Sequence, residues 1–252
     1  MKIAVVTGAS SGMGREMALQ LSDHFPFDEI WVIGRRMERL CQLKEQTGTR
    51  LRFLSLDLTR GEDLKRLAEA LKEKEPEVKF LVNAAGYGKM GPVGAASFGE
   101  ETGMVRLNCE ALCAVTRLVL PYMPHNSRII QFASAAAFLP QPDFAVYAAS
   151  KAFVLSYSRA LGEELRDRDI YVTAVCPGPV KTEFLELAET TGQIPLYKRL
   201  VMANPRHVVR KALKDSIMGR PVSVYGLTMK VFLLLTKILP HSMILAAMRK
   251  LS

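Results

Sequence analysis

Two side chains four residues apart could share the transfer of a proton. Tyr147 and Lys151 fall on a segment predicted to be helical, so they lie on the same face of that helix. A free phenol has a pKa of about 10 and is a poor acid–base catalyst at neutral pH. A nearby ammonium favours the phenolate and lowers that pKa, which makes the two residues a chemically sensible pair. Taken alone the spacing decides little, because such pairs are common on helix surfaces.

A serine hydroxyl supplies a third group. Ser134 follows a predicted strand over residues 128–133, at the end where parallel α/β sheets place ligand contacts. Its hydroxyl could donate a hydrogen bond to a carbonyl oxygen on which negative charge develops. Serine, tyrosine and lysine together therefore indicate chemistry at a carbonyl or carbinol group.

A glycine-rich turn follows the first predicted strand. The run TGASSGMG spans residues 7–14 and leads into a predicted helix over 13–23. Glycines at positions 8, 12 and 14 let the backbone approach an anionic ligand, and the free N–H groups at the helix start favour a pyrophosphate. An ordinary loop is the alternative, but the strand before the turn and the helix after it favour nucleotide binding.

Two arginines follow the second predicted strand, residues 29–33. An acidic residue there would bind a ribose 2′-hydroxyl, as in NAD sites, whereas the forked donors of a guanidinium suit a 2′-phosphate. Arg35 and Arg36 therefore predict NADP(H) as the cofactor, with Arg35 the better candidate because it lies nearer the strand end. Two solvent-exposed arginines at a helix start are the alternative.

These residues must be positioned by alternating strands and helices. The predicted strands cover residues 3–7, 29–33, 51–56, 79–82, 128–133, 170–176 and 222–225, and the predicted helices 13–23, 37–46, 62–72, 101–122 and 147–166. Most strands are continuous apolar runs, typical of strands buried on both faces. The sequence therefore predicts an α/β fold, a single-domain Rossmann-type doubly wound parallel sheet with helices on both faces.

The amino-acid composition limits the classes of protein to which the chain can belong. With 252 residues, 49% hydrophobic and 23% charged, the chain is a globular one rather than disordered or a disulfide scaffold. Its four cysteines form no CxxC pair and have no histidine beside them, which predicts free thiols in a reducing compartment and no metal site. No signal-peptide pattern opens the chain, and no apolar run is long enough to span a membrane. We therefore expect a cytoplasmic location, peripheral to a membrane if the C-terminus contacts one.

Taken together, the motifs resemble the short-chain dehydrogenase/reductase family, and the resemblance covers nearly the whole chain. Besides the residues named above, it includes Asp57 in the run LDLT, the run NAAG at 83–86, Asn108, and Pro177-Gly178 followed by Val180 and Thr182. Ala84 replaces the family's second Asn, and Ala135 follows Ser134 where many members have a second Ser. Neither change removes a catalytic group.

The resemblance implies a reaction and a site. Hydride moves between a nicotinamide and a carbonyl or carbinol carbon, while Tyr147 gives or takes the hydroxyl proton. Lys151 lowers the pKa of Tyr147 and contacts the nicotinamide ribose. Ser134 polarises the carbonyl, and Asn108 positions a water behind Lys151. The residues that the resemblance implies for cofactor binding are Gly8, Ser10, Ser11, Gly12, Met13, Gly14, Arg35, Arg36, Asp57, Leu58, Asn83, Ala84, Gly86, Tyr147, Lys151, Pro177, Gly178, Val180 and Thr182.

In this family the segment after Pro177-Gly178 forms a substrate lid, here about residues 183–205. Its apolar members are Phe184, Leu185, Leu187, Ile194, Pro195, Leu196 and Tyr197. Such a lining suits a small apolar ketone or alcohol, steroid- or lipid-like, and plain packing of the lid is the alternative. An NADP(H)-dependent carbonyl reductase or alcohol dehydrogenase is the leading hypothesis. A 3-oxoacyl thioester reductase and, in another class, a non-catalytic NADP-binding sensor or scaffold stay open.

The C-terminal region is basic and apolar. Residues 198–252 hold eleven Lys and Arg and one acid, so they carry the net positive charge of the chain. We assign residues 1–226 to the catalytic domain and residues 227–252 to a helical extension. For residues 228–252 three interpretations stay open: contact with a membrane surface, a lid over the substrate, or subunit packing in a homodimer or homotetramer. The family pairs its two long helices in such oligomers. No nucleic-acid-binding motif is present, so we expect no nucleic-acid partner.

Overall fold

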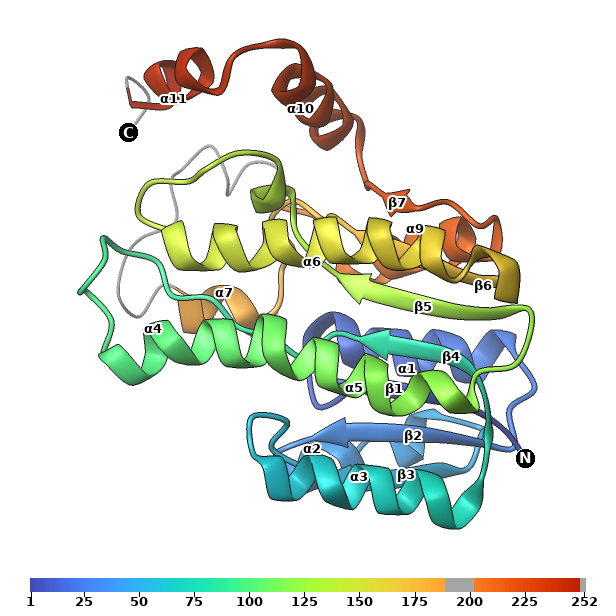
Figure 1. Ribbon diagram of the computed structural model, residues 1–252. Coiled ribbons are helices and arrows are strands. Elements are labelled where there is room, and N and C mark those ends of the chain that lie inside the picture. The colour runs from blue at the N-terminus through green and yellow to red at the C-terminus, as the bar shows by residue number, and fades with distance from the viewer. Residues whose placement is uncertain (189–201, 250–252) are drawn as a thin grey trace.

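The computed structural model describes residues 1–188 and 202–249, and its centre is one seven-stranded sheet (Figure 1). The strands are β1 (Lys2–Thr7), β2 (Glu29–Gly34), β3 (Leu51–Ser55), β4 (Glu77–Asn83), β5 (Ser127–Phe132), β6 (Ile170–Val175) and β7 (Val222–Ser223). They are all parallel, in the order β3-β2-β1-β4-β5-β6-β7. The order reverses between β1 and β4, and ligands of open α/β sheets bind outside the carboxyl ends of the strands at such a point. The predicted α/β fold class is confirmed.

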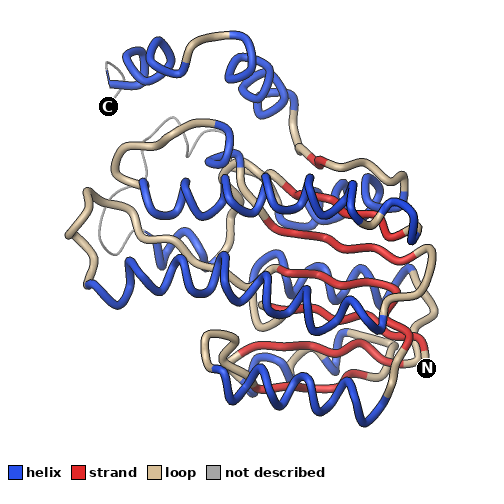
Figure 2. Tube along the Cα trace, viewed as in Figure 1, coloured by secondary structure: helices blue, strands red, loops and turns tan. Residues whose placement is uncertain are grey.

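Helices cover both faces of the sheet (Figure 2). They are α1 (Gly12–His24), α2 (Met37–Cys41), α3 (Gly61–Lys74), α4 (Phe98–Val105), α5 (Leu112–Val119), α6 (Ala145–Glu164), α7 (Glu183–Ala188), α9 (Pro205–Ile217), α10 (Leu227–Ile238) and α11 (His241–Arg249). One face of the sheet packs against α3, α5 and α6, and the other against α1, α2 and α9. Neighbours in β1 serve opposite faces: Val5 joins the first core and Val6 the second. This division explains why the strands are apolar throughout.

Several elements differ from their predicted extents. The helix predicted over 37–46 ends at Cys41 and is followed by a separate short 3₁₀ turn over 44–46. The long helix predicted over 101–122 contains a π-helical stretch, Arg106–Ala111, between α4 and α5. The last strand is two residues long rather than four. Helix α9 was not predicted, although Asn204 followed by Pro205 is a typical helix start, and the Asn204 side chain accepts a hydrogen bond from the N–H of Arg206.

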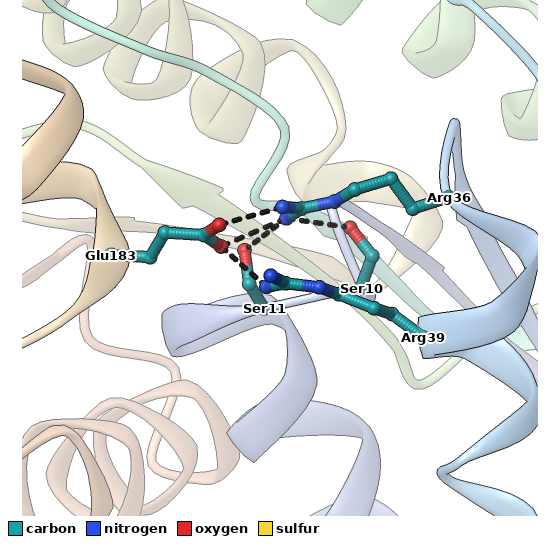
Figure 3. A network of polar contacts seen from close by, with 5 residues as sticks. All are labelled: Ser10, Ser11, Arg36, Arg39 and Glu183. Atoms are coloured by element: carbon teal, nitrogen blue, oxygen red, sulfur yellow. Dashed lines mark hydrogen bonds and ion pairs between the residues drawn. The ribbon is translucent and has the colours of Figure 1, made fainter.

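One cluster of ion pairs, the Glu183 clasp, fastens α7 to the segment that follows β2 (Figure 3). Both terminal nitrogens of Arg36 donate to the Glu183 carboxylate, at 2.6 and 2.9 Å, and Nη1 of Arg39 donates to it at 2.9 Å. Arg36 also donates to Oγ of Ser11 at 3.1 Å. The hydrogen bonds from Arg36, helped by Ser11 and by the charge of Arg39, lower the pKa of Glu183 to about 2. The clasp therefore joins two segments that are 147 residues apart in the chain.

We expect Glu183→Gln to lower the stability of the fold at neutral pH and to lose this effect in acid. The carboxyl has a usual pKa of 4.5, lowered to about 2 when folded. Its stabilisation is therefore fully present above pH 4.5 and lost as the pH falls toward 2. Denaturant unfolding of the wild type and of Glu183→Gln between pH 6 and pH 3 measures the difference between their free energies of unfolding. Glu186→Gln, on an exposed residue of the same helix, is the control. A difference in the free energy of unfolding that stayed constant across this range would contradict the lowered pKa of Glu183.

Candidate functional site

The glycine turn is shaped by the close approach of β1 to the residues that follow β4. Gly8 has φ +66°, and a Cβ placed on it would lie 2.7 Å from the backbone of Ala84. A Cβ on Gly14 would overlap the carbonyl of Gly8. Oγ1 of Thr7 accepts hydrogen bonds from the N–H groups of Ala84 and Ala85, at 3.1 and 3.2 Å, and holds this approach in place. The turn is a backbone cradle at the N-terminus of α1, which fits a pyrophosphate.

A cavity of about 800 Å³ runs from this cradle across the carboxyl ends of the strands to α10. It brings together most of the residues predicted for the site. Those that line it are Gly8, Ser10, Ser11, Gly12, Met13, Gly14, Arg35, Arg36, Asp57, Leu58, Ala84, Gly86, Ser134, Tyr147, Lys151, Pro177, Gly178, Val180 and Thr182. The dimensions and the run of residues suit an extended dinucleotide with a second ligand at one end.

Asn83 does not line the cavity. It is the last residue of β4, and its buried side chain donates from Nδ2 to Oγ1 of Thr116 in α5 at 3.0 Å. Side chains of a strand alternate between the two faces, and Leu81, two residues earlier, also packs toward α5. The Asn83 side chain therefore braces the sheet against α5, and a contact between Asn83 and the cofactor stays a prediction.

Asn108 lies in the π-helical stretch and is fully buried. Its Oδ1 accepts from the N–H of Tyr87 at 3.1 Å, while Nδ2 donates to the Tyr87 carbonyl at 2.9 Å and to Oγ of Ser150 at 3.0 Å. These bonds tie the loop after β4 to α6. The Asn108 side chain is thus hydrogen-bonded to protein groups, and the predicted placing of a water by Asn108 stays a prediction.

Three side chains converge at the centre of the cavity. Tyr147, in the first turn of α6, shares a hydrogen bond with Ser134, which follows β5. Lys151, one turn along α6, donates from Nζ to the carbonyl of Phe132 at 2.8 Å and lies 5.7 Å from the centre of the Tyr147 ring. Oγ of Ser134 accepts from the N–H of Ala136 at 3.1 Å, so its own proton remains available for donation. The geometry suits polarisation of a carbonyl beside a proton donor.

Burial dominates the electrostatics of the pair. Loss of solvent raises the pKa of Tyr147 to about 12, although the hydrogen bond with Ser134 partly opposes it. Loss of solvent lowers the pKa of Lys151 to about 8. The net shift of the Tyr147 pKa is therefore upward, and a lowering of that pKa by the Lys151 ammonium stays a prediction. A phenol with this pKa is protonated at pH 7.

Apolar side chains surround the phenol. Phe144 stacks on Tyr147 with ring centres 4.2 Å apart, and Phe184 of α7 lies at 5.4 Å. From α10, Met229 and Phe232 line the same cavity. Of the predicted lid residues, Phe184, Leu185 and Leu187 line the cavity, whereas Ile194, Pro195, Leu196 and Tyr197 lie outside the described residues. The sequence analysis did not single out Met229 and Phe232, whose three-residue spacing places them on one face of α10.

The two arginines after β2 differ in their surroundings. Arg36 is held in the Glu183 clasp, which Figure 3 shows from close by. Arg35 is exposed at the cavity wall, and its guanidinium makes no hydrogen bond to any residue in the described ranges. The clasp was not predicted, because nothing in the local sequence connects Glu183 to residues that precede it by so many positions.

Comparison with known proteins agrees with this geometry. A model of the short chain dehydrogenase family matches residues 2–192. The chain is 30% identical to 17-beta-hydroxysteroid dehydrogenase type 3 of Rattus norvegicus, over 75% of this chain and 63% of that protein. It is 32% identical to the very-long-chain 3-oxoacyl-CoA reductase of Aspergillus terreus, over 83% of this chain and 59% of that protein. The chain thus spans about six tenths of the length of these two relatives.

A solved structure shares the fold almost from end to end. A short-chain dehydrogenase from Sphingobium yanoikuyae, in complex with NADPH, superimposes with a TM-score of 0.78 at 26% identity, over 90% of this chain and 89% of that one. The family model covers more than half of the chain, and both relatives named above share at least 30% of their aligned residues with it. The chain belongs to the short-chain dehydrogenase/reductase family of oxidoreductases.

Proposed function

We propose that the protein is an NADP(H)-dependent oxidoreductase that interconverts a ketone or aldehyde and an alcohol on an apolar, steroid- or lipid-like substrate. One observation carries the proposal: Tyr147, Ser134 and Lys151 converge in the same cavity as the glycine cradle. The convergence of these three groups supports an enzyme over a non-catalytic sensor or scaffold. The aromatic surroundings of the phenol support an apolar substrate.

Each group has one task in the proposed reaction. A bound nicotinamide supplies or accepts the hydride. Ser134 donates a hydrogen bond to the carbonyl oxygen of the substrate, where charge develops as the carbonyl is reduced. The neutral hydroxyl of Tyr147 then gives its proton to that oxygen. Lys151, close behind the ring, stabilises the phenolate that this transfer leaves. Phe144 and Phe184 keep water from the phenol.

The cofactor preference is proposed from the charge at the end of β2. Gly34 is followed by Arg35 and Arg36 and not by an acid, so the wall of the cavity offers cations to a 2′-phosphate. The Arg36 guanidinium is already hydrogen-bonded to Glu183, so Arg35 is the principal phosphate ligand in this proposal. The NADPH complex of the Sphingobium yanoikuyae relative supports the same preference.

A 3-oxoacyl thioester is the second candidate substrate. The similarity to the very-long-chain 3-oxoacyl-CoA reductase of Aspergillus terreus favours it, and the basic C-terminal region suits the phosphates of a thioester carrier. We also propose a homodimer or homotetramer that pairs α4, α5 and α6. Exposed apolar side chains on these helices, Val105 and Phe153, support this assembly.

We expect Tyr147→Phe to lower kcat for ketone reduction by about 10²–10⁴-fold, since the proton donor is lost, while NADPH binding is retained. Turnover is followed by NADPH absorbance across a panel of steroids, 3-oxoacyl thioesters and aldehydes, and binding by NADPH fluorescence. Tyr157→Phe makes the same change further along α6, outside the cavity, and serves as the control. Turnover near that of the wild type in Tyr147→Phe would refute the assignment of the proton donor.

Arg35→Ala is expected to weaken NADPH binding by about 10- to 100-fold and to leave NADH binding unchanged. The expected size is that of one or two hydrogen bonds to a charged group. Titration of NADPH and NADH against the wild type and Arg35→Ala gives the ratio of the dissociation constants of the two proteins for each cofactor. NADH is the internal control because it lacks the 2′-phosphate. An equal loss for the two cofactors, or none for NADPH, would show that Arg35 does not bind the phosphate.

The raised pKa of Tyr147 predicts opposite pH dependence for the two directions. Ketone reduction needs the protonated phenol, which a pKa of about 12 keeps fully populated at neutral pH. Alcohol oxidation needs the phenolate, whose fraction grows as the pH rises toward that pKa. Initial rates between pH 6 and pH 9 should therefore rise with pH for oxidation and stay level or fall for reduction. An oxidation rate that is already independent of pH at 7 would contradict this.

A further inference from the structure

Helix α10 has two apolar faces, and among the described residues only one of them packs on the protein. Met229, Phe232 and Leu233 pack against the core cluster that contains Phe138 and Val224. The rings of Phe232 and Phe138 are 6.3 Å apart. A Cβ on Gly178 would lie 2.6 Å from the sulfur of Met229. The inner face of α10 thus sits directly over the substrate end of the cavity.

The second face points to solvent, and we name it the outer face of α10. It consists of Leu227, Val231, Leu234, Leu235 and Ile238, whose side chains are 43–77% exposed. At 3.6 residues per turn these five positions fall within an arc of about 100°, opposite the inner face. The chain continues from them through Leu239 and Met243, which are also exposed. A run of large apolar side chains of this kind marks an interaction site.

The charged residues of the chain segment that carries the outer face have one sign. Residues 216–252 contain five Lys and Arg and no Asp or Glu. Lys230 and Lys237 are seven residues apart, and the same helical geometry places both along one edge of the outer face. Lysines at the border of an apolar helix face can keep their ammonium groups at the level of lipid headgroups while the apolar side chains enter the hydrocarbon boundary.

We propose that the outer face of α10 docks on an anionic lipid bilayer. The apolar stripe would enter the boundary of the hydrocarbon, and the lysines would meet anionic headgroups. A second copy of this chain fits less well, because a two-fold contact sets the same surface against itself and would bring like charges together. None of the helices in the described ranges is long and apolar enough to cross a membrane, and α10 has 12 residues, so the contact is with the surface.

The position of α10 connects this surface to the proposed chemistry. Figure 1 shows α10 and α11 beyond α6, standing apart from the sheet. Because α10 lines the cavity with one face and would meet the bilayer with the other, it would bring an apolar substrate dissolved in the bilayer close to the cavity that holds Tyr147. This last step rests on the proposed function, whereas the docking itself does not.

Vesicle binding tests the docking without substrate or cofactor. The full chain is sedimented with vesicles of phosphatidylcholine alone and with vesicles of three parts phosphatidylcholine to one part phosphatidylglycerol. We expect strong binding to the anionic vesicles and weak binding to the neutral ones. The triple variant Leu227→Ser, Leu234→Ser, Ile238→Ser is expected to lose at least about tenfold in affinity for the anionic vesicles. Lys230→Gln with Lys237→Gln should remove the preference for anionic lipid.

A matched control and a fold check accompany these variants. Ile217→Ser with Met218→Ser also removes exposed apolar side chains, but near the C-terminal end of α9, and should leave vesicle binding unchanged. Thermal unfolding and NADPH fluorescence show whether each variant keeps its fold. Equal binding by the wild type and the triple variant would overturn the proposal. So would a triple variant that changes the oligomeric state measured by light scattering, because the face would then be a subunit contact.

Activity measurements separate this proposal from the proposed function. If vesicles bind but no carbonyl substrate is reduced, the docking stands and the reaction is wrong. If substrates are reduced but the wild type does not bind anionic vesicles, the reaction stands and the docking is wrong. When both hold, the triple variant should keep its rate on a water-soluble ketone and lose rate on a substrate that is presented in anionic vesicles.

Discussion

The close contact between the turn after β1 and the residues after β4 is the constraint on which the rest of the site depends. With no side chain at Gly8, the turn after β1 comes within contact distance of the backbone at Ala84, and Thr7 accepts hydrogen bonds from the N–H groups of Ala84 and Ala85. With no side chain at Gly14, the first turn of α1 packs closely on Gly8. The contact with Ala84 lies where the strand order reverses, so it sets the floor of the cavity. Any Cβ at these two glycines would push the cradle away from β4 and so away from Ser134 and Tyr147.

Helix α7 couples the two ends of the cavity. Glu183, its first residue, is held by Arg36 and Arg39 at the cofactor end, and the next residue, Phe184, packs against the ring of Tyr147 at the substrate end. Because these two contacts come from adjacent residues, the start of this six-residue helix cannot shift at one of them without disturbing the other. Movement of the clasp would therefore change the packing around the phenol, so that cofactor affinity and substrate affinity should not be independent in this protein.

Much of the fold could be predicted from the sequence because it depends on local pattern. Apolar runs predicted the strands, the glycine run predicted the turn, and the spacing of Tyr147 and Lys151 predicted that both lie on one helix face. The position of Asn83 was also open to prediction, since strand alternation puts it on the α5 side with Leu81. The Glu183 clasp and the raised pKa of Tyr147 were not, because the first depends on a contact across the fold and the second on burial, which no local pattern reveals.

The burial of Tyr147 and Lys151 also favours an apolar substrate for the cavity. Removing water raises the pKa of the phenol and lowers that of the amine, so both changes reduce the charge that the site must hold. A charged substrate would have to lose its hydration among Phe144, Phe184 and Phe232, none of which can replace the lost hydrogen bonds. A ketone on an apolar skeleton leaves only its oxygen to be satisfied, and in the proposed reaction Ser134 and Tyr147 form hydrogen bonds to that oxygen. The electrostatics of the catalytic groups and the apolarity of the walls therefore favour the same class of substrate.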